Sequence, residues 1–261
     1  MRVAIYQGPQ QSDSLEDNLA AIEAAAADAA AKGADLLITP EMSATGYNVS
    51  DGYASTAEEH DGPINQRMAE VARAHDIALV FGYPEKADGT LYNTAAAFDA
   101  SGIEIARYRK THLFGRFEKE HFTPADDLIL QFDFNGVRCG IVVCYDVEFP
   151  EVVRAHADAG TQLLIVPTAL MDPFDFVAEK VVPVRAWENE ICLIYTNRCG
   201  REGDLSYVGL SCAIASDGTE SARAGRDEEI LIADIDEAAL VAGHKLNTYL
   251  GDRRLDLYGH P

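Results

Sequence analysis

The chain has 261 residues, of which 48% are hydrophobic, and it carries 43 acidic against 21 basic side chains for a formal net charge of -22. This composition allows a sizeable buried core, and no Pro-, Ser- or Gly-rich linker divides the sequence, so we expect one domain over residues 1–261. The negative charge argues against nucleic acid and anionic membranes as partners, because both would be repelled.

Taken in chain order, the first elements alternate between strand and helix. Strands are predicted over residues 3–7, 36–39 and 78–82, and helices over 14–32 and 64–74. Ser14 with Asp17 forms a capping-box start for the first helix, and Gly33 suits its C-terminus. Strands over 93–99 and 103–109 are joined by Ala100-Ser101-Gly102, which predicts a hairpin.

The second half continues with hairpins and alternating elements. Asn135-Gly136, a strong hairpin signal, separates predicted strands over 128–134 and 137–144. Helix 150–159, strand 163–167, helix 174–189 and strand 191–196 then alternate, followed by strands 209–215 and 230–235 and a short helix from Glu237. The pattern predicts an α/β fold in which two mixed sheets pack face to face with helices outside.

The sequence lacks the motifs of protein targeting, membrane insertion and metal binding. The first residues lack the basic and apolar regions of a signal peptide, and no apolar run reaches the roughly 18 residues of a membrane helix, so we expect a cytoplasmic protein. The five cysteines form no CxxC pair and the seven histidines no HExxH motif. We therefore expect neither a disulfide framework nor a metal site.

Cys144 lies where a strand rich in β-branched residues ends and a helix begins near Pro150. A thiol at the C-terminal edge of a sheet is placed where open α/β proteins build their sites, and nearby backbone N–H groups favour the thiolate. A buried cysteine that only fills space is the ordinary alternative. Cys139, Cys192, Cys199 and Cys212 lack this setting, and we interpret them as core or incidental residues.

Glu41 and Lys110 also follow predicted strands. A carboxylate that is partly withdrawn from water acquires the raised pKa of a general base, and an ammonium group can stabilise an oxyanion. An exposed loop glutamate and a solvated lysine are the ordinary alternatives, which position alone leaves open.

The sequences around these three residues are more specific. Thr39-Pro-Glu-Met42, Tyr108-Arg-Lys-Thr-His-Leu-Phe114 and Cys144-Tyr-Asp-Val-Glu-Phe-Pro-Glu151 resemble the signature blocks of the nitrilase (carbon-nitrogen hydrolase) superfamily, in that family's order. The likeness extends through Tyr92-Asn-Thr-Ala95, Val166-Pro-Thr168, Arg185-Ala-Trp-Glu-Asn189 and Gly209-Leu-Ser211, hence over nearly the whole chain.

This resemblance implies a four-layer α-β-β-α sandwich that needs no cofactor. It implies Cys144 as nucleophile, Glu41 as general base and acid, and Lys110 as oxyanion stabiliser. The family has a second glutamate that positions the substrate; Glu118 matches it best, and Glu120 is the alternative. The resemblance also implies a homodimer or higher homo-oligomer, with the helices from Pro150 and Phe174 as candidate faces.

Further residues are candidates for the substrate site. The backbone N–H of Tyr145 is expected to share the oxyanion with Lys110. Aromatic side chains near the signature blocks are candidates for a small apolar pocket, with plain core packing as the alternative: Phe114, Phe117, Tyr145, Phe149 and Phe174. We also place Thr168 and Ala169 in the substrate site.

The expected reaction is hydrolysis of a small aliphatic or ω-amide to a carboxylic acid and ammonia, because the compact chain resembles the amidase branch of the superfamily. A nitrilase or N-carbamoyl amino acid hydrolase is the runner-up. No clear basic cluster is present to hold a substrate carboxylate, although Arg116 and Arg198 are candidates. A catalytically silent binding subunit ranks third, because the three chemical residues occur together.

Overall fold

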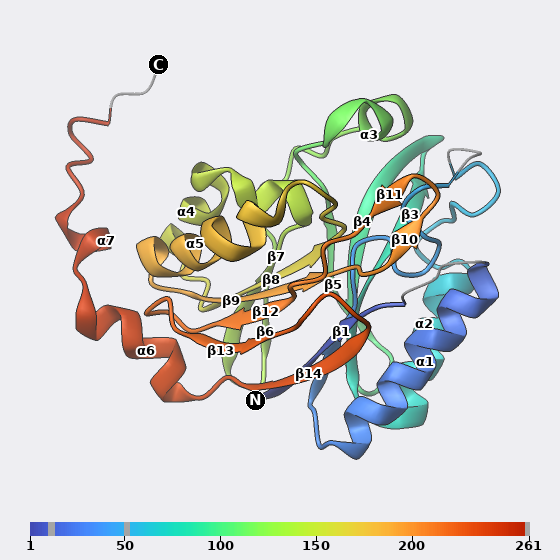
Figure 1. Ribbon diagram of the computed structural model, residues 1–261, viewed down its shortest axis with the longest axis horizontal. Helices are drawn as coiled ribbons and strands as arrows, with labels where there is room; N and C mark the ends of the chain where they lie inside the picture. Colours follow the sequence, from blue (N-terminus) through green and yellow to red (C-terminus); the bar gives the residue numbers. More distant parts are fainter. Residues whose placement is uncertain (10–13, 50–52, 259–261) are drawn as a thin grey trace.

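Two six-stranded sheets pack against each other at the centre of the protein (Figure 1). The computed structural model describes residues 1–9, 14–49 and 53–258. The first sheet has the order β14 (Glu229–Asp234), β1 (Arg2–Gln7), β2 (Leu36–Ile38), β3 (Ala78–Ala87), β4 (Thr90–Phe98) and β5 (Glu104–Arg109). The second has the order β13 (Glu220–Arg223), β12 (Cys212–Ile214), β9 (Cys192–Asn197), β8 (Leu163–Thr168), β7 (Val137–Ile141) and β6 (Gln131–Phe134).

Both sheets are mixed, as the sequence predicts. In the first sheet β2 runs parallel to both β1 and β3, whereas the other neighbours are antiparallel. In the second sheet β8 runs parallel to both β7 and β9, and again the remaining pairs are antiparallel.

The alternation of side chains along the strands explains the layers. In β1, Val3 and Ile5 belong to the core shared by the two sheets, whereas Ala4 and Tyr6 belong to the core under helices α1 (Leu15–Ala31) and α2 (Pro63–His75). Helices α4 (Pro150–Asp158) and α5 (Val182–Asn189) cover the outer face of the second sheet (Figure 1). The four-layer α-β-β-α sandwich is thus confirmed.

The local signals of the sequence are confirmed as well. Asn135 and Gly136 both adopt positive φ, 48° and 78°, and join β6 to β7 in the predicted hairpin. The side chain of Ser14 accepts a hydrogen bond from the backbone N–H of Asp17 at the start of α1. The hairpin of β4 and β5 and the start of α6 (Glu237–Leu246) also agree with the prediction.

Several predicted elements are shorter or interrupted. The strand predicted over 209–215 is reduced to β12, because Gly209 and Leu210 take left-handed φ values of 65° and 60°. The helix predicted over 174–189 consists of a π-helical turn, Val177–Val181, followed by α5. The strand predicted to reach Cys144 ends at Ile141.

Other elements carry too weak a pattern to be predicted. They are α3 (Gly115–His121), α7 (Tyr249–Asp252), β13, and the hairpin of β10 (Arg201–Glu202) and β11 (Leu205–Ser206). Within the described ranges, no helix combines the length and apolar character that crossing a membrane requires.

Candidate active site

Glu41, Lys110 and Glu118 come together as one buried ionic cluster. The Nζ atom of Lys110 lies 2.8 Å from Oε1 of Glu41 and 2.7 Å from Oε1 of Glu118. All three side chains are fully withdrawn from solvent. Glu120, by contrast, lies on the surface and pairs with Arg116 at 2.5 Å. The geometry therefore favours Glu118 over Glu120 as the second glutamate of the site.

The loop after β2 holds Glu41 against the neighbouring strand β3. Gly82 of β3 lies so close that a Cβ atom there would collide with the backbone of Met42 and Glu41. The backbone N–H of Ala44 also donates to the carbonyl of Gly82 at 3.0 Å. Close packing therefore fixes the backbone that carries Glu41.

Each oxygen of the Glu41 carboxylate has a different environment. Oε1 accepts hydrogen bonds from Lys110 and from Nδ2 of Asn93, the latter at 2.7 Å, whereas Oε2 has no partner among the described residues. Burial raises the pKa of Glu41, Lys110 counteracts this, and the nearby Glu118 raises it further. A buried carboxylate with one free oxygen and a raised pKa has the properties of a general base.

Lys110 stays charged in this environment. Burial alone would lower its pKa, but Glu118 and Glu41 outweigh burial and raise it well above the usual value. Glu118 is held in turn by the hydroxyl of Tyr47 at 2.7 Å and the backbone N–H of Phe114 at 2.7 Å. The cluster thus presents a fixed ammonium group of the kind that can stabilise an oxyanion.

Cys144 begins a tight turn beside this cluster. It has a left-handed φ of 48° and starts the 3-10 helix Cys144–Glu148. Burial raises the pKa of Cys144 well above its usual value, and Glu41 raises it further; Lys110 and the backbone N–H of Ala169 act in the opposite direction. The resting group is therefore a neutral thiol that needs a base, and Glu41 is close enough to influence it.

Asp146 ties the turn of Cys144 to the loop of Lys110. Its Oδ2 accepts from the hydroxyl of Tyr108 and the backbone N–H of Val143, each at 3.0 Å. Its Oδ1 accepts from the hydroxyl of Thr111 and the backbone N–H of His112, each at 2.9 Å. One buried carboxylate therefore fixes the spacing between the thiol and the ammonium group, a role that the sequence analysis did not assign to it.

A small cavity of about 190 Å³ opens onto the Cys144 thiol. This is below the roughly 300–1,000 Å³ of pockets for drug-sized ligands, so the cavity suits a small molecule. Its wall is mostly apolar and aromatic. The lining residues are Tyr47, Phe114, Cys144, Tyr145, Glu148, Ala169, Leu170, Met171 and Phe174.

The cavity includes some of the predicted substrate residues and leaves out others. Tyr145, Ala169, Phe114 and Phe174 line it. The remaining three lie outside its lining: Phe117 packs against Tyr47, Tyr53 and His121, Phe149 stacks on His112 at 4.2 Å, and Thr168 is fully buried in β8.

Arg198, a sequence candidate for holding a substrate carboxylate, has another position. Its buried guanidinium faces the carbonyls of Glu41 and Met42, at 3.5 and 3.3 Å, and Glu202 at 3.9 Å. Glu202 also accepts from the backbone N–H of Tyr47 at 3.0 Å. Arg198 and Glu202 therefore support the loop that carries Glu41 and the tyrosine that holds Glu118.

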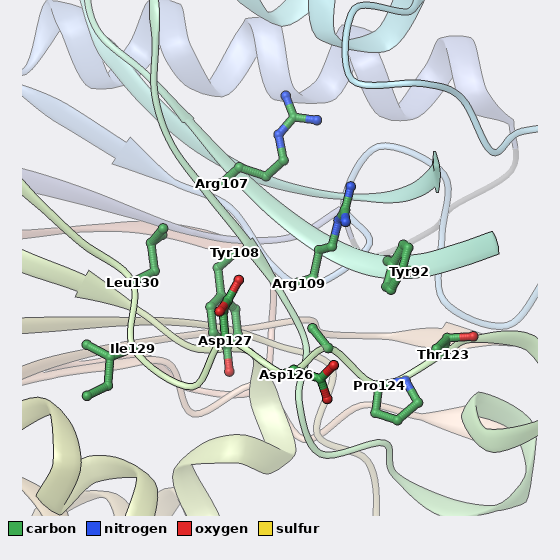
Figure 2. A pocket seen from close by; sticks show the side chains of 11 residues that line it. Tyr92, Arg107, Tyr108, Arg109, Thr123, Pro124, Asp126, Asp127, Ile129 and Leu130 are labelled. Atoms are coloured by element: carbon green, nitrogen blue, oxygen red, sulfur yellow. The ribbon is translucent and has the colours of Figure 1, made fainter. Parts of the chain in front are cut away.

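A second cavity, of about 480 Å³, lies at the β5 edge of the first sheet (Figure 2). Its lining includes Arg107 and Arg109, which are paired with Glu85 at 2.9 and 2.7 Å, and Arg109 lies over the ring of Tyr92 at 4.3 Å. Cys144, Glu41, Lys110 and Glu118 are not part of its lining. Size alone thus does not identify the site, because the smaller cavity is the one that Cys144 lines.

Comparisons with known proteins agree with this geometry. The family model described as Carbon-nitrogen hydrolase matches residues 2–243. The chain is 42% identical over 260 residues to a protein of Pseudomonas protegens named "Hydrolase in pqqF 5'region", covering 99% of this chain and 90% of that one. It is 36% identical over 226 residues to an (R)-stereoselective amidase of Pseudomonas sp, covering 86% and 81%.

A solved structure is also closely similar. It is a mutant of the amidase from Nesterenkonia sp. AN1 that shows covalent addition of the acetamide moiety of fluoroacetamide at the active site cysteine. The TM-score is 0.90 at 36% identity, covering 99% of this chain and 95% of that chain. Another mutant of the same amidase was solved in complex with butyramide. By the match of the family model and these identities, the chain belongs to the carbon-nitrogen hydrolase family.

Proposed function

We propose that the protein is an amidase that hydrolyses small amides to a carboxylic acid and ammonia. The observation that carries this proposal is a small cavity in which the Cys144 thiol adjoins a buried base and a buried cation. The relatives named as amidases, and the amide bound by one of them, support the same reaction class.

The residues around the cavity have separate roles in the first step of the reaction. The free Oε2 of Glu41 takes the thiol proton while the sulfur of Cys144 attacks the amide carbonyl carbon and forms a C–S bond. The Nζ of Lys110 stabilises the oxyanion, together with the backbone N–H of Tyr145, which as an early residue of a 3-10 helix has no intrahelical acceptor. Glu118 holds Lys110 in place.

The intermediate then collapses in two stages. The C–N bond breaks, and Glu41 returns its proton to the leaving nitrogen, which departs as ammonia and leaves a thioester on Cys144. Glu41 next takes a proton from water as the water oxygen attacks the thioester carbonyl. The C–S bond breaks, the carboxylic acid leaves, and the proton returns to the sulfur of Cys144.

An assay of amides, nitriles and N-carbamoyl amines for released ammonia tests this proposal. We expect turnover of butyramide, loss of turnover in Cys144→Ala, and an acyl adduct on Cys144 in the mass spectrum of the intact protein. Turnover of nitriles without amides would point to a nitrilase, and ammonia from none of the three classes would point to a binding subunit.

We also propose that the protein self-associates through the outer face of α5 and the segment before it. Phe174, Phe176 and Val184, which are 41%, 66% and 49% exposed, lie within this short stretch of chain, and a group of exposed apolar side chains is typical of a contact between protein chains. Light scattering after size-exclusion chromatography should give at least twice the 28.3 kDa chain mass. A Phe176→Glu variant should shift the mass toward that of one chain.

A cytoplasmic location is the last part of the proposal. All five cysteines are free thiols, which suits a reducing compartment. Cell fractionation followed by immunodetection tests this, and recovery in the periplasmic or secreted fraction would contradict it.

A further inference from the structure

We infer that Glu148 selects substrates by charge, so that the site accepts neutral or cationic amides and rejects amides that carry a carboxylate. The inference rests on the proposed amidase function, because it concerns the substrate of the same site. Glu148 ends the 3-10 helix that Cys144 begins, and both residues line the small cavity. The nucleophile and this carboxylate thus belong to one short turn.

The position of Glu148 favours a carboxylate that faces the site. Its half-buried side chain forms part of the cavity wall. Burial raises the pKa of Glu148, and the charges of Lys110 and Arg185 act against that rise. Because Lys110 is buried at the base of the site, its influence on Glu148 is consistent with a carboxylate that points inward.

Lys110 and Arg185 act on this carboxylate only through their charge, without direct contact. In the described part of the chain, no hydrogen bond or ion pair reaches it. Arg185 donates instead to the carbonyls of Val147 and Glu148, at 3.0 and 2.7 Å, and pairs with Glu188 at 2.8 Å. The oxygens of Glu148 therefore remain available to a donor group on a ligand.

A substrate carboxylate would find no free cation in the cavity. The lining contains no lysine or arginine, and Lys110 behind it is already shared by Glu41 and Glu118. Arg116 is on the surface, and Arg198 faces backbone carbonyls. An anionic amide would thus lose its hydration and meet a like charge, whereas an ammonium group would gain a partner.

Three amides of similar size test this inference: butyramide, β-alaninamide with a terminal ammonium, and succinamate with a terminal carboxylate. For the wild type we expect kcat/KM for β-alaninamide to exceed that for succinamate by roughly tenfold or more at low salt. Added salt should narrow this ratio. In Glu148→Gln the ratio of kcat/KM for β-alaninamide to that for succinamate should fall toward one. Butyramide is the neutral reference substrate in each variant.

Glu151→Gln is the matched control, because this exposed glutamate of α4 is outside the cavity lining; its ratio should equal that of the wild type. Equal use of succinamate and β-alaninamide by the wild type, or an unchanged ratio in Glu148→Gln, overturns the inference. If Glu148→Gln fails to fold, the salt dependence of the wild-type ratio tests the inference instead, and a ratio that salt does not narrow overturns it. If all three amides are inert, the proposed function fails. Calorimetry with Cys144→Ala then still shows whether the cationic amide binds more tightly than the anionic one.

Discussion

The Nζ atom of Lys110 lies 2.8 Å from Oε1 of Glu41, although the two residues are 69 positions apart in the sequence. Both side chains are fully buried, so each charge depends on the other. Lys110 also separates Glu41 from Glu118, which would otherwise be two adjacent unpaired carboxylates. The consequences for activity and stability can be measured.

Replacing Lys110 by Met should abolish turnover and lower stability. Removal of one partner leaves buried charge uncompensated, which costs about 3–5 kcal/mol. In the variant, the pKa of Glu41 should rise further above its unfolded value, because the charge of Lys110 no longer counteracts burial, so the protonated form of Glu41 favours folding. The loss of stability relative to wild type should therefore be largest at neutral pH and shrink as the pH falls toward 5. Denaturant unfolding at several pH values checks this, and a pH-independent difference would contradict it.

The pH profile of the wild type should report Glu41. Because the pKa of Glu41 is raised above 4.5 and the carboxylate form is the base, kcat/KM should decrease as the pH falls, with a midpoint above 4.5. Butyramide is a suitable substrate because it does not titrate in this range. A rate that stays constant down to pH 4.5 would argue against Glu41 as the base.

Cys144 should be the cysteine that reacts in the native protein. All five cysteines are buried, but the Cys144 thiol lines a cavity that admits small molecules. Iodoacetamide should label Cys144 ahead of Cys139, Cys192, Cys199 and Cys212, as peptide mass spectrometry would show. Denatured protein should label at all five. Equal labelling in the native state would refute the assignment.

Asp146→Asn should impair both activity and stability. The amide presents an NH₂ group where one carboxylate oxygen accepts two hydrogen bonds, so buried donors lose their acceptor at a cost of about 1–3 kcal/mol. Because Asp146 sets the spacing of Cys144 and Lys110, kcat should fall more than KM rises. Asp133→Asn removes an exposed pair with Arg138 and serves as the control. A folded Asp146→Asn variant with wild-type kcat would contradict the positioning role.

The sequence by itself determined the features that depend on residues close together along the chain. The strand predicted over residues 3–7 and the Asn135-Gly136 turn reflect local preferences, and both are confirmed. The blocks around Glu41, Lys110 and Cys144 indicated the family for the same reason, since each is a short continuous segment. The strand predicted from residue 209 begins only at Cys212, because Gly209 and Leu210 have a left-handed backbone.

Only the tertiary structure decided which side chains meet. Glu118 and Glu120 are two positions apart, and residues so spaced on a helix face different directions; packing turned Glu118 to Lys110 and left Glu120 in solvent. Arg198 faces the backbone of Glu41 from 157 positions away, and Phe117 and Phe149 lie outside the cavity lining. Such contacts depend on how the ends of two sheets pack together, and that packing is not encoded in any short segment.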